Sequence, residues 1–332
     1  MHYRSFYTFC LLVLFLISCK KDKSEKEEEL DEGKAVITLS VPTGFPYPSI
    51  PADNEPTRYR IELGRRLFTD PILSRDSSIS CSSCHKDDLY FTDGLAVPIG
   101  INNLAGTRNA PSLLNVAYQP YFLWDGGVPK LEQQVLAPIE AHNEMDYDVN
   151  LVVDRLNRIE SYRDAFNKAY DQNASVFALT RAIACYERTL FSTSSRFDDY
   201  QYNNNAAALN ASEFNGMNLF FGERGECFHC HGTYNFTDNS FKNNGLYLNY
   251  ADSGRARITT LQSDVGKFKV PSLRNIVYTA PYMHDGSMNT LEEVVEHYNL
   301  GGKAHINKSG LLRPLNLTSQ EKTDLVNFLK AL

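Results

Sequence analysis

The chain contains the string Cys81-Ser82-Ser83-Cys84-His85, and the same pattern returns as Cys227-Phe228-His229-Cys230-His231. Two cysteines three apart with a histidine directly after them are typical of a covalent attachment site for c-type haem. The thiols add to the haem vinyl groups, and the adjacent imidazole can bind the iron as proximal ligand. A zinc ribbon would also pair two Cys-x-x-Cys knuckles, but it does not require a histidine after each. We therefore expect two c-type haems, attached through Cys81, Cys84, Cys227 and Cys230, with His85 and His231 as proximal iron ligands.

The composition fits a protein with two hydrophobic cores. The 332 residues are 42% hydrophobic, and this length favours two domains. The net charge of -7 argues against nucleic acid as a partner and is compatible with a basic electron-donor protein. Of the seven cysteines, four belong to the haem strings and two lie near the N-terminus, which leaves Cys185. No disulfide framework is therefore expected in the mature protein.

The N-terminus resembles the signal sequence of a bacterial lipoprotein. Its apolar run is too short to span a bilayer, and Leu16-Ile17-Ser18-Cys19 matches a lipobox. We predict that residues 1–18 are a signal peptide, that Cys19 is acylated, and that the charged segment 19–41 is a tether. The protein is then exported and lipid-anchored on the periplasmic face of the outer membrane, with display on the cell surface as an alternative. A plain signal peptide with an incidental cysteine is the other interpretation.

Helical patterns precede both haem strings. Apolar residues recur on one face of 58–68 and of 211–221, and Pro71 and Gly222 end these two segments. Each half therefore has the order helix, loop, haem string. The other predicted elements are an extended proline-rich strap over 42–56, helices over 149–166 and 175–191, and a closing helix over 318–332 with the capping residues Thr318 and Glu321.

An internal repeat connects the two halves. Pro111-Ser112-Leu113-Leu114-Asn115 matches Pro271-Ser272-Leu273-Arg274-Asn275, and Trp124-Asp125-Gly126 matches His284-Asp285-Gly286, at one constant offset along the chain. A fixed offset over several strings indicates duplication. We therefore predict an all-α protein of two cytochrome c-like domains, residues 42–202 and 203–332, with the haems near the domain interface.

In combination, these strings resemble the bacterial dihaem cytochrome c peroxidases, a family that includes the tyrosine-ligated branch that matures methylamine dehydrogenase. The resemblance covers the chain from about residue 50 to the C-terminus. Besides the haem strings it rests on Leu63-Gly64-Arg65-Arg66-Leu67-Phe68, Arg108-Asn109-Ala110-Pro111, Trp124-Asp125-Gly126 and Ala280-Pro281-Tyr282-Met283-His284-Asp285-Gly286. The family implies that the haem of domain 42–202 reacts with peroxide and that the haem of domain 203–332 transfers electrons.

The resemblance assigns roles at the first haem to Gln134 and Glu144. Cleavage of peroxide needs a group that takes a proton from one oxygen and delivers it to the other, and Glu144 is expected to be this acid/base. Gln133 is the alternative to Gln134. The family often closes the first iron with a histidine, but residues 86–108 contain none, and the corresponding position falls within 100–103. We therefore expect an open or water-bound first iron that needs no prior reduction.

Two further sites follow from the resemblance. Trp124 is the only tryptophan in the chain, and the family places it between the haems as an electron relay, although a plain core role is compatible with this. A calcium ion is implied between the domains, held by Asn109 and by the backbone carbonyls of Thr279 and Pro281, because oxygen ligands suit this cation.

The sixth ligand of the second haem falls on Tyr298 in the family register. The alternatives are Met283, Met288 and His297. A methionine ligand would raise the potential of this haem, whereas a tyrosinate would lower it.

The expected activity is the reduction of hydrogen peroxide to water with electrons from a small cytochrome or cupredoxin. One alternative is a dihaem oxidase that acts on a protein or organic substrate through high-valent iron and surface aromatic residues. Another is a non-catalytic electron-transfer or redox-sensing cytochrome, against which Gln134 and Glu144 argue, because a carrier needs no proton-transfer groups at an open iron. A homodimer is left open as the assembly.

Overall fold

The computed structural model describes residues 31–192 and 194–332, and every absence stated below refers to these residues. The predicted signal peptide, Cys19 and most of the predicted tether lie outside them. No helix in the described part is long and apolar enough to cross a membrane.

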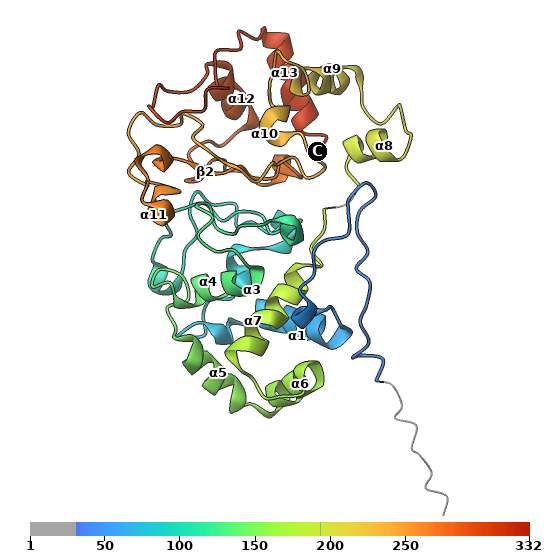
Figure 1. Ribbon diagram of the computed structural model, residues 1–332, viewed down its shortest axis with the longest axis vertical. Helices are drawn as coiled ribbons and strands as arrows, with labels where there is room; N and C mark the ends of the chain where they lie inside the picture. The colour runs from blue at the N-terminus through green and yellow to red at the C-terminus, as the bar shows by residue number, and fades with distance from the viewer. Residues whose placement is uncertain (1–30, 193) are drawn as a thin grey trace, which may run out of the picture. The chain divides into compact units, whose positions relative to one another are not determined.

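The described chain is rich in helices and has one short antiparallel strand pair (Figure 1). The helices of the first half are α1 (Arg58–Thr69), α2 (Cys81–Cys84), α3 (Leu131–Gln134), α4 (Leu136–Glu140), α5 (Val149–Asn157), α6 (Glu160–Tyr170) and α7 (Val176–Glu187). The second half contains α8 (Arg196–Tyr202), α9 (Ala211–Phe220), α10 (Phe228–His231), α11 (Ala256–Thr259), α12 (Leu291–Asn299) and α13 (Ser319–Leu329), with β1 (Phe241–Lys242) paired to β2 (Phe268–Lys269).

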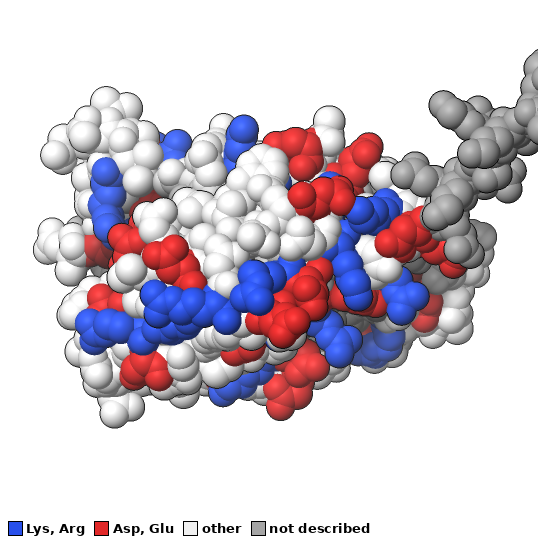
Figure 2. Space-filling model, turned by 90° about the horizontal axis from the view of Figure 1, so that it is seen from below, with Lys and Arg blue, Asp and Glu red and all other residues white. Residues whose placement is uncertain are grey.

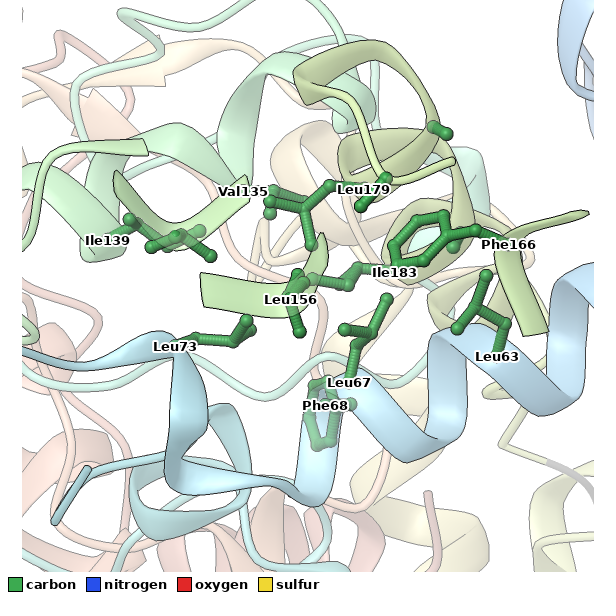
Figure 3. Close-up of a cluster of buried hydrophobic side chains, with 14 of the residues drawn as sticks. Leu63, Leu67, Phe68, Leu73, Val135, Ile139, Leu156, Phe166, Leu179 and Ile183 are labelled. Atoms are coloured by element: carbon green, nitrogen blue, oxygen red, sulfur yellow. The ribbon is translucent and has the colours of Figure 1, made fainter. Parts of the chain in front are cut away.

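The first core forms where α1 crosses α7. Leu67 and Ile183 are fully buried there, and Leu67 of α1 points toward Ile183 of α7 (Figure 3). Gly64 makes the close crossing possible, because a Cβ at this position would lie 1.9 Å from the carbonyl oxygen of Ala182. The predicted helix over 58–68 is confirmed within one residue.

The second core repeats this construction with α9 and α13. A Cβ on Gly216 would lie 2.0 Å from the carbonyl oxygen of Asp324, so a glycine again brings two helices together. The predicted caps are present, since the Thr318 hydroxyl accepts from the Glu321 amide and the Glu321 carboxylate accepts from the Thr318 amide. Both cores therefore join the helix before a haem string to a helix that follows much later in the chain.

One predicted helical segment is divided in the structure. The pattern over 149–166 is interrupted because Ile159 has extended backbone angles, and α5 and α6 lie on either side of it. The break lets Leu156 and Phe166 both enter the first core, where each is fully buried.

The two cores belong to one compact unit, Glu32–Leu332. Phe197 on α8 already packs in the second core, a few residues before the predicted start of the second domain at residue 203. That boundary stays a prediction.

The matched repeat residues Asn115 and Asn275 have nearly equal φ angles, 58° and 56°, and the Asn115 amide donates to Asn235 of the second half at 3.1 Å. The repeated strings thus share a backbone conformation, and duplication is the origin that we propose for it.

The predicted strap is extended apart from a turn at residues 43–44 and a short 3-10 turn, Ala52–Asn54. The ring of Phe45 packs against Tyr234 of the second half, with ring centroids 4.9 Å apart. The Asn54 amide donates to Glu132 of the first half at 2.9 Å. The strap therefore contacts both halves.

Candidate dihaem site

The first haem string folds as the single-turn helix α2. The amide of His85 donates to the carbonyl of Cys81 at 2.9 Å, which places the imidazole directly after the turn that holds both cysteines. The Nδ1 atom of His85 lies 3.0 Å from the carbonyl oxygen of Phe91. Burial lowers the pKa of His85, so the ring is neutral and Nδ1 carries the proton that this carbonyl accepts. The Nε2 lone pair is left for an iron.

The second haem string, around α10, has the same construction. The amide of His231 donates to the carbonyl of Cys227 at 2.9 Å, and its Nδ1 lies 2.7 Å from the carbonyl oxygen of Phe236. Burial lowers the pKa of His231 as well. A proximal histidine whose other ring nitrogen donates to a backbone carbonyl has a fixed tautomer and orientation. Both sites therefore fit the attachment and proximal ligation of c-type haem.

The four cysteines of these strings form no disulfide bond. In the described part of the chain, no three histidine, cysteine or acidic side chains converge as a metal cluster. The two Cys-x-x-Cys knuckles consequently do not form the shared tetrahedral site of a zinc ribbon.

Glu144 lies near the first attachment site. Burial raises the pKa of Cys81 and of Cys84, and the Glu144 carboxylate adds to the rise at both thiols. Burial also raises the pKa of Glu144 itself. A carboxyl group with a raised pKa close to a reaction site can hold a proton near neutral pH and release it again.

The two candidate glutamines point to different surroundings. Gln133 is exposed and lines a surface cavity together with Lys130 and Arg181, whereas Gln134 is half-buried on α3. The cavity of Gln133 contains no residue of the haem strings. Gln134 is therefore the better candidate at the first haem.

The loop that would carry a closing histidine lies against the backbone beside Glu144. The amide of Ile101 donates to the carbonyl of Glu144 at 2.8 Å, and a Cβ on Gly100 would lie 2.2 Å from the carbonyl oxygen of Asn143. Asn102 and Asn103 are exposed. The loop thus presents no side chain suited to iron at this position.

A second buried carboxyl near the first site was not predicted. Glu187, the last residue of α7, is 3% exposed, and its Oε2 has no hydrogen-bond partner in the described residues. Burial raises the pKa of Glu187 to about 8. Its charge also raises the pKa of Cys81. Only its spacing indicates that Glu187 is buried, because it follows the buried Ile183 by four residues and so lies on the same face of α7.

The second haem string opens into a cavity of about 290 Å³. Cys227, Cys230 and His231 line it, and so do two of the four candidate sixth ligands, Tyr298 and Met283. Burial raises the pKa of Tyr298 to about 12.

The other two candidate ligands have different roles. Met288 packs against the second core, and the Nε2 atom of His297 lies 2.9 Å from the carbonyl oxygen of Asn244. The Asn244 amide donates to the Met283 sulfur at 3.3 Å, and an Asn244 hydrogen bond to the Tyr298 hydroxyl lowers the pKa of Tyr298 against the effect of burial. Asn244 was not predicted, because its contacts come from distant parts of the chain.

Trp124 lines the same cavity as His231 and Tyr298. Its Nε1 donates to the carbonyl of Asn109 at 2.8 Å, and its own carbonyl accepts from the amide of Lys269 at 2.8 Å. Burial lowers the pKa of Lys269 to about 8. The Asn109 carbonyl therefore holds the indole, while β2 holds the backbone of Trp124.

The three predicted calcium residues also meet at this cavity. Asn109, Thr279 and Pro281 all line it. The Asn109 amide nitrogen donates to the carbonyl of Leu95 at 2.9 Å, which fixes the side chain. Amide and carbonyl oxygens are the ligand type that calcium takes.

Comparisons with known proteins point to one family. Residues 58–206 match the family described as di-haem cytochrome c peroxidase. The methylamine utilization protein MauG of Methylorubrum extorquens is 37% identical over 295 residues, 88% of this chain and 82% of that protein. Cytochrome c551 peroxidase of Nitrosomonas europaea is 32% identical over 313 residues, 90% of each chain. Among solved structures, a MauG-like protein associated with microbial copper homeostasis is similar with a TM-score of 0.83 at 38% identity, over 88% of this chain and 94% of that one.

Proposed function

This chain belongs to the di-haem cytochrome c peroxidase family, and we propose that it reduces hydrogen peroxide to water with electrons from an external donor. The family expected from the sequence is confirmed, and with it an oxidoreductase that carries two c-type haems. Small cytochromes and cupredoxins are the donors that we propose.

The observation that carries the proposal is the difference between two otherwise equal haem strings. Both histidines have Nδ1 bound to a backbone carbonyl, and each string has a half-buried carboxyl within electrostatic range of a thiol. The carboxyl beside the second string, Glu226, is paired with Arg313, whereas burial raises the pKa of Glu144 beside the first string. Haem bound at these strings supplies redox-active iron. The first site is then the one equipped for proton transfer, and the second is the one equipped for electron transfer.

Glu144 takes the proton from the inner oxygen of peroxide and delivers it to the outer oxygen, which leaves as water. Its raised pKa supports this role, because a group that both accepts and donates a proton works best when its pKa is near the ambient pH. Gln134, an uncharged amide, orients peroxide without competing for its protons.

The first site accepts peroxide in the fully oxidised protein. The absence of a histidine from residues 86–108 and the packing of Gly100 and Ile101 against the Glu144 segment support this part of the proposal.

Tyr298 is the sixth ligand that we propose for the second iron. Its burial beside His231 supports this, and Met283 in the same cavity is the competitor. The pKa of about 12 applies to Tyr298 with no metal ion bound. A bound ferric ion would favour the phenolate form. An anionic ligand stabilises ferric iron, so the second haem then has a low potential.

A low-potential second haem favours a second candidate function, the peroxide-driven oxidation of a protein or organic substrate. In that case Trp124 shares the oxidising equivalents between the two sites. Its position on the cavity of His231 and Tyr298 supports the relay.

Steady-state kinetics of the diferric holoprotein test the main function. Peroxide consumption with a reduced small cytochrome should begin without a lag and without pre-reduction. A reduced cupredoxin serves as the second donor. Absence of turnover with both donors, before and after pre-reduction, would refute the peroxidase assignment.

Matched variants test the ligand. Tyr298→Phe should change the visible spectrum of the second haem and raise its potential, while Met283→Leu should leave both unchanged. A near-infrared band typical of methionine ligation in the wild-type protein, lost in Met283→Leu, would reassign the ligand to Met283.

The charge on one face of the molecule favours neither an acidic nor a basic electron-donor protein. Figure 2 shows that basic and acidic side chains alternate on one face of the molecule and do not form a surface of one sign.

We propose calcium at Asn109, Thr279 and Pro281 as a structural ion, whose removal by a chelator should lower turnover.

A further inference from the structure

Two tyrosines from different halves of the chain stack on each other at the protein surface. The rings of Tyr90 and Tyr278 have centroids 4.2 Å apart and are tilted by only 5°. Tyr278 is 53% exposed. The pKa of Tyr90 is raised by desolvation and by its charge and hydrogen-bond interactions with Tyr278, so the two hydroxyl groups interact directly.

The strap contacts a second tyrosine pair, which the internal repeat relates to the first at one position. Tyr118 corresponds to Tyr278, and it meets Tyr234, which follows the second haem string, with ring centroids 5.5 Å apart. Phe45 of the strap packs against both rings, and the Tyr118 hydroxyl donates to the carbonyl of Pro46 at 3.0 Å. The two pairs differ in geometry, because the Tyr118 and Tyr234 rings meet edge to face at 75°, and Asn235 rather than Tyr234 corresponds to Tyr90. The strap packs against this pair, whereas Tyr278 stays accessible to solvent.

Each tyrosine of the stacked pair, Tyr90 and Tyr278, is a sequence neighbour of a residue at one haem site. Tyr90 directly precedes Phe91, whose carbonyl lies 3.0 Å from the Nδ1 atom of His85. Tyr278 directly precedes Thr279, which lines the cavity of Trp124 and His231. Each tyrosine is thus one residue away from the surroundings of one site.

We propose that Tyr90 and Tyr278 are a redox-active surface site at which small phenols and aromatic amines are oxidised. This inference rests on the proposed peroxidase function, which supplies the oxidant. Reduction of one peroxide to two water molecules takes two electrons and two protons. Each tyrosine can deliver one electron inward while its phenolic proton passes to solvent. Two substrate molecules then return one electron and one proton each, and leave as radicals.

The surroundings define the class of substrate. Asp87 and Asp88, both exposed, lie within three residues of Tyr90. Their negative charge favours neutral or cationic aromatic molecules over aromatic carboxylates. The flat face of an exposed tyrosine also offers a stacking surface to such molecules.

Radical trapping on the holoprotein tests the proposal independently of turnover. Wild-type protein is treated with peroxide and a nitroso spin trap without any donor, and the adducts are located by peptide mass spectrometry. The adduct should lie on Tyr90 or Tyr278, and it should disappear in the double variant Tyr90→Phe/Tyr278→Phe. The matched control Tyr118→Phe/Tyr234→Phe should keep it.

Kinetics complete the test. Oxidation of a phenylenediamine should fall at least tenfold in Tyr90→Phe/Tyr278→Phe, while peroxide turnover with a reduced cytochrome stays unchanged. Adducts on other residues only, or an unchanged amine oxidation rate in this variant, would overturn the proposal and leave the peroxidase assignment standing. Absence of peroxide reduction with every donor would overturn both.

Discussion

Among single residues, Glu144 has the most specific predicted role in catalysis, that of the acid/base. Glu144→Gln keeps the shape of the side chain but removes its exchangeable proton, so peroxide turnover should fall about 10²- to 10⁴-fold. The visible spectra of both haems should stay the same. Stopped-flow mixing with peroxide measures the effect, and the exposed Glu140→Gln on α4 is the control. Turnover of Glu144→Gln within a factor of two of the wild-type protein would remove Glu144 from the mechanism.

Glu187 makes the stability of the protein depend on pH. Burial raises the pKa of Glu187 from 4.5 to about 8. Between these values the folded state holds a proton that the unfolded state has lost. The contribution of Glu187 is therefore fully present below about pH 4.5 and is lost as the pH rises to 8, at up to about 1.4 kcal/mol per unit of pKa shift.

The variant Glu187→Gln should lack this part of the pH dependence. Thermal unfolding followed by circular dichroism from pH 5 to pH 9 should show a steeper loss of stability in the wild-type protein than in the variant. Parallel curves would show that the carboxyl is ionised in the folded protein throughout this range.

The residues of the site differ in how far the sequence predicts them. The haem strings are recognised by spacing alone, because the attachment chemistry needs those residue types next to one another. Glu144 and Tyr298 were found only through the family register. Lys269 and Asn244 were not found, because their roles depend on contacts between segments far apart in the chain.

At the level of helices, the two glycine crossings are the features most sensitive to substitution. Alanine favours a helix over glycine by about 0.8–1 kcal/mol. A Cβ on Gly64 would lie 1.9 Å from a backbone oxygen, which cannot move away as a flexible side chain can. Gly64→Ala should therefore lower the free energy of unfolding, by about 1–3 kcal/mol as for other overpacked cores.

Chemical denaturation of the holoprotein measures this change. Gly310→Ala is the control, since a Cβ at Gly310 would meet no atom within 4 Å, and its effect should stay within about 0.5 kcal/mol. A Gly64→Ala protein as stable as the control would mean that α1 and α7 can separate without cost.

The helices themselves were predictable where capping residues and apolar periodicity agree. The segments before both haem strings and the closing helix were predicted within a few residues of α1, α9 and α13. The break between α5 and α6 was missed, because the apolar pattern continues across Ile159 and only the packing of both helices on one core requires the bend.

For the whole molecule, the membrane anchor predicted from the sequence falls in a segment outside the described residues. We propose that Cys19 is acylated, and Cys19→Ala should then move the protein from the membrane fraction to the soluble fraction, because stable anchoring needs more than one acyl chain. Cell fractionation with a salt wash measures this. A Cys19→Ala protein that stays with the membranes would point to another means of attachment.

Two hydrophobic cores could be expected from the length of the chain and from the helical patterns before both haem strings, whereas the duplication stays a prediction. The role of the strap could not, because an extended segment has no periodicity that indicates its partners. Phe45 finds its partner Tyr234 almost two hundred residues later in the chain, and such a contact leaves no local pattern.

The two helix crossings also set an order of events during maturation. A chain is synthesised from its N-terminus, so α1 and Cys81 emerge long before α7, which α1 needs to bury its apolar face. The same delay separates α9 and Cys227 from α13. The hydrophobic core next to each haem string is therefore complete only once the later helix of that half has been made.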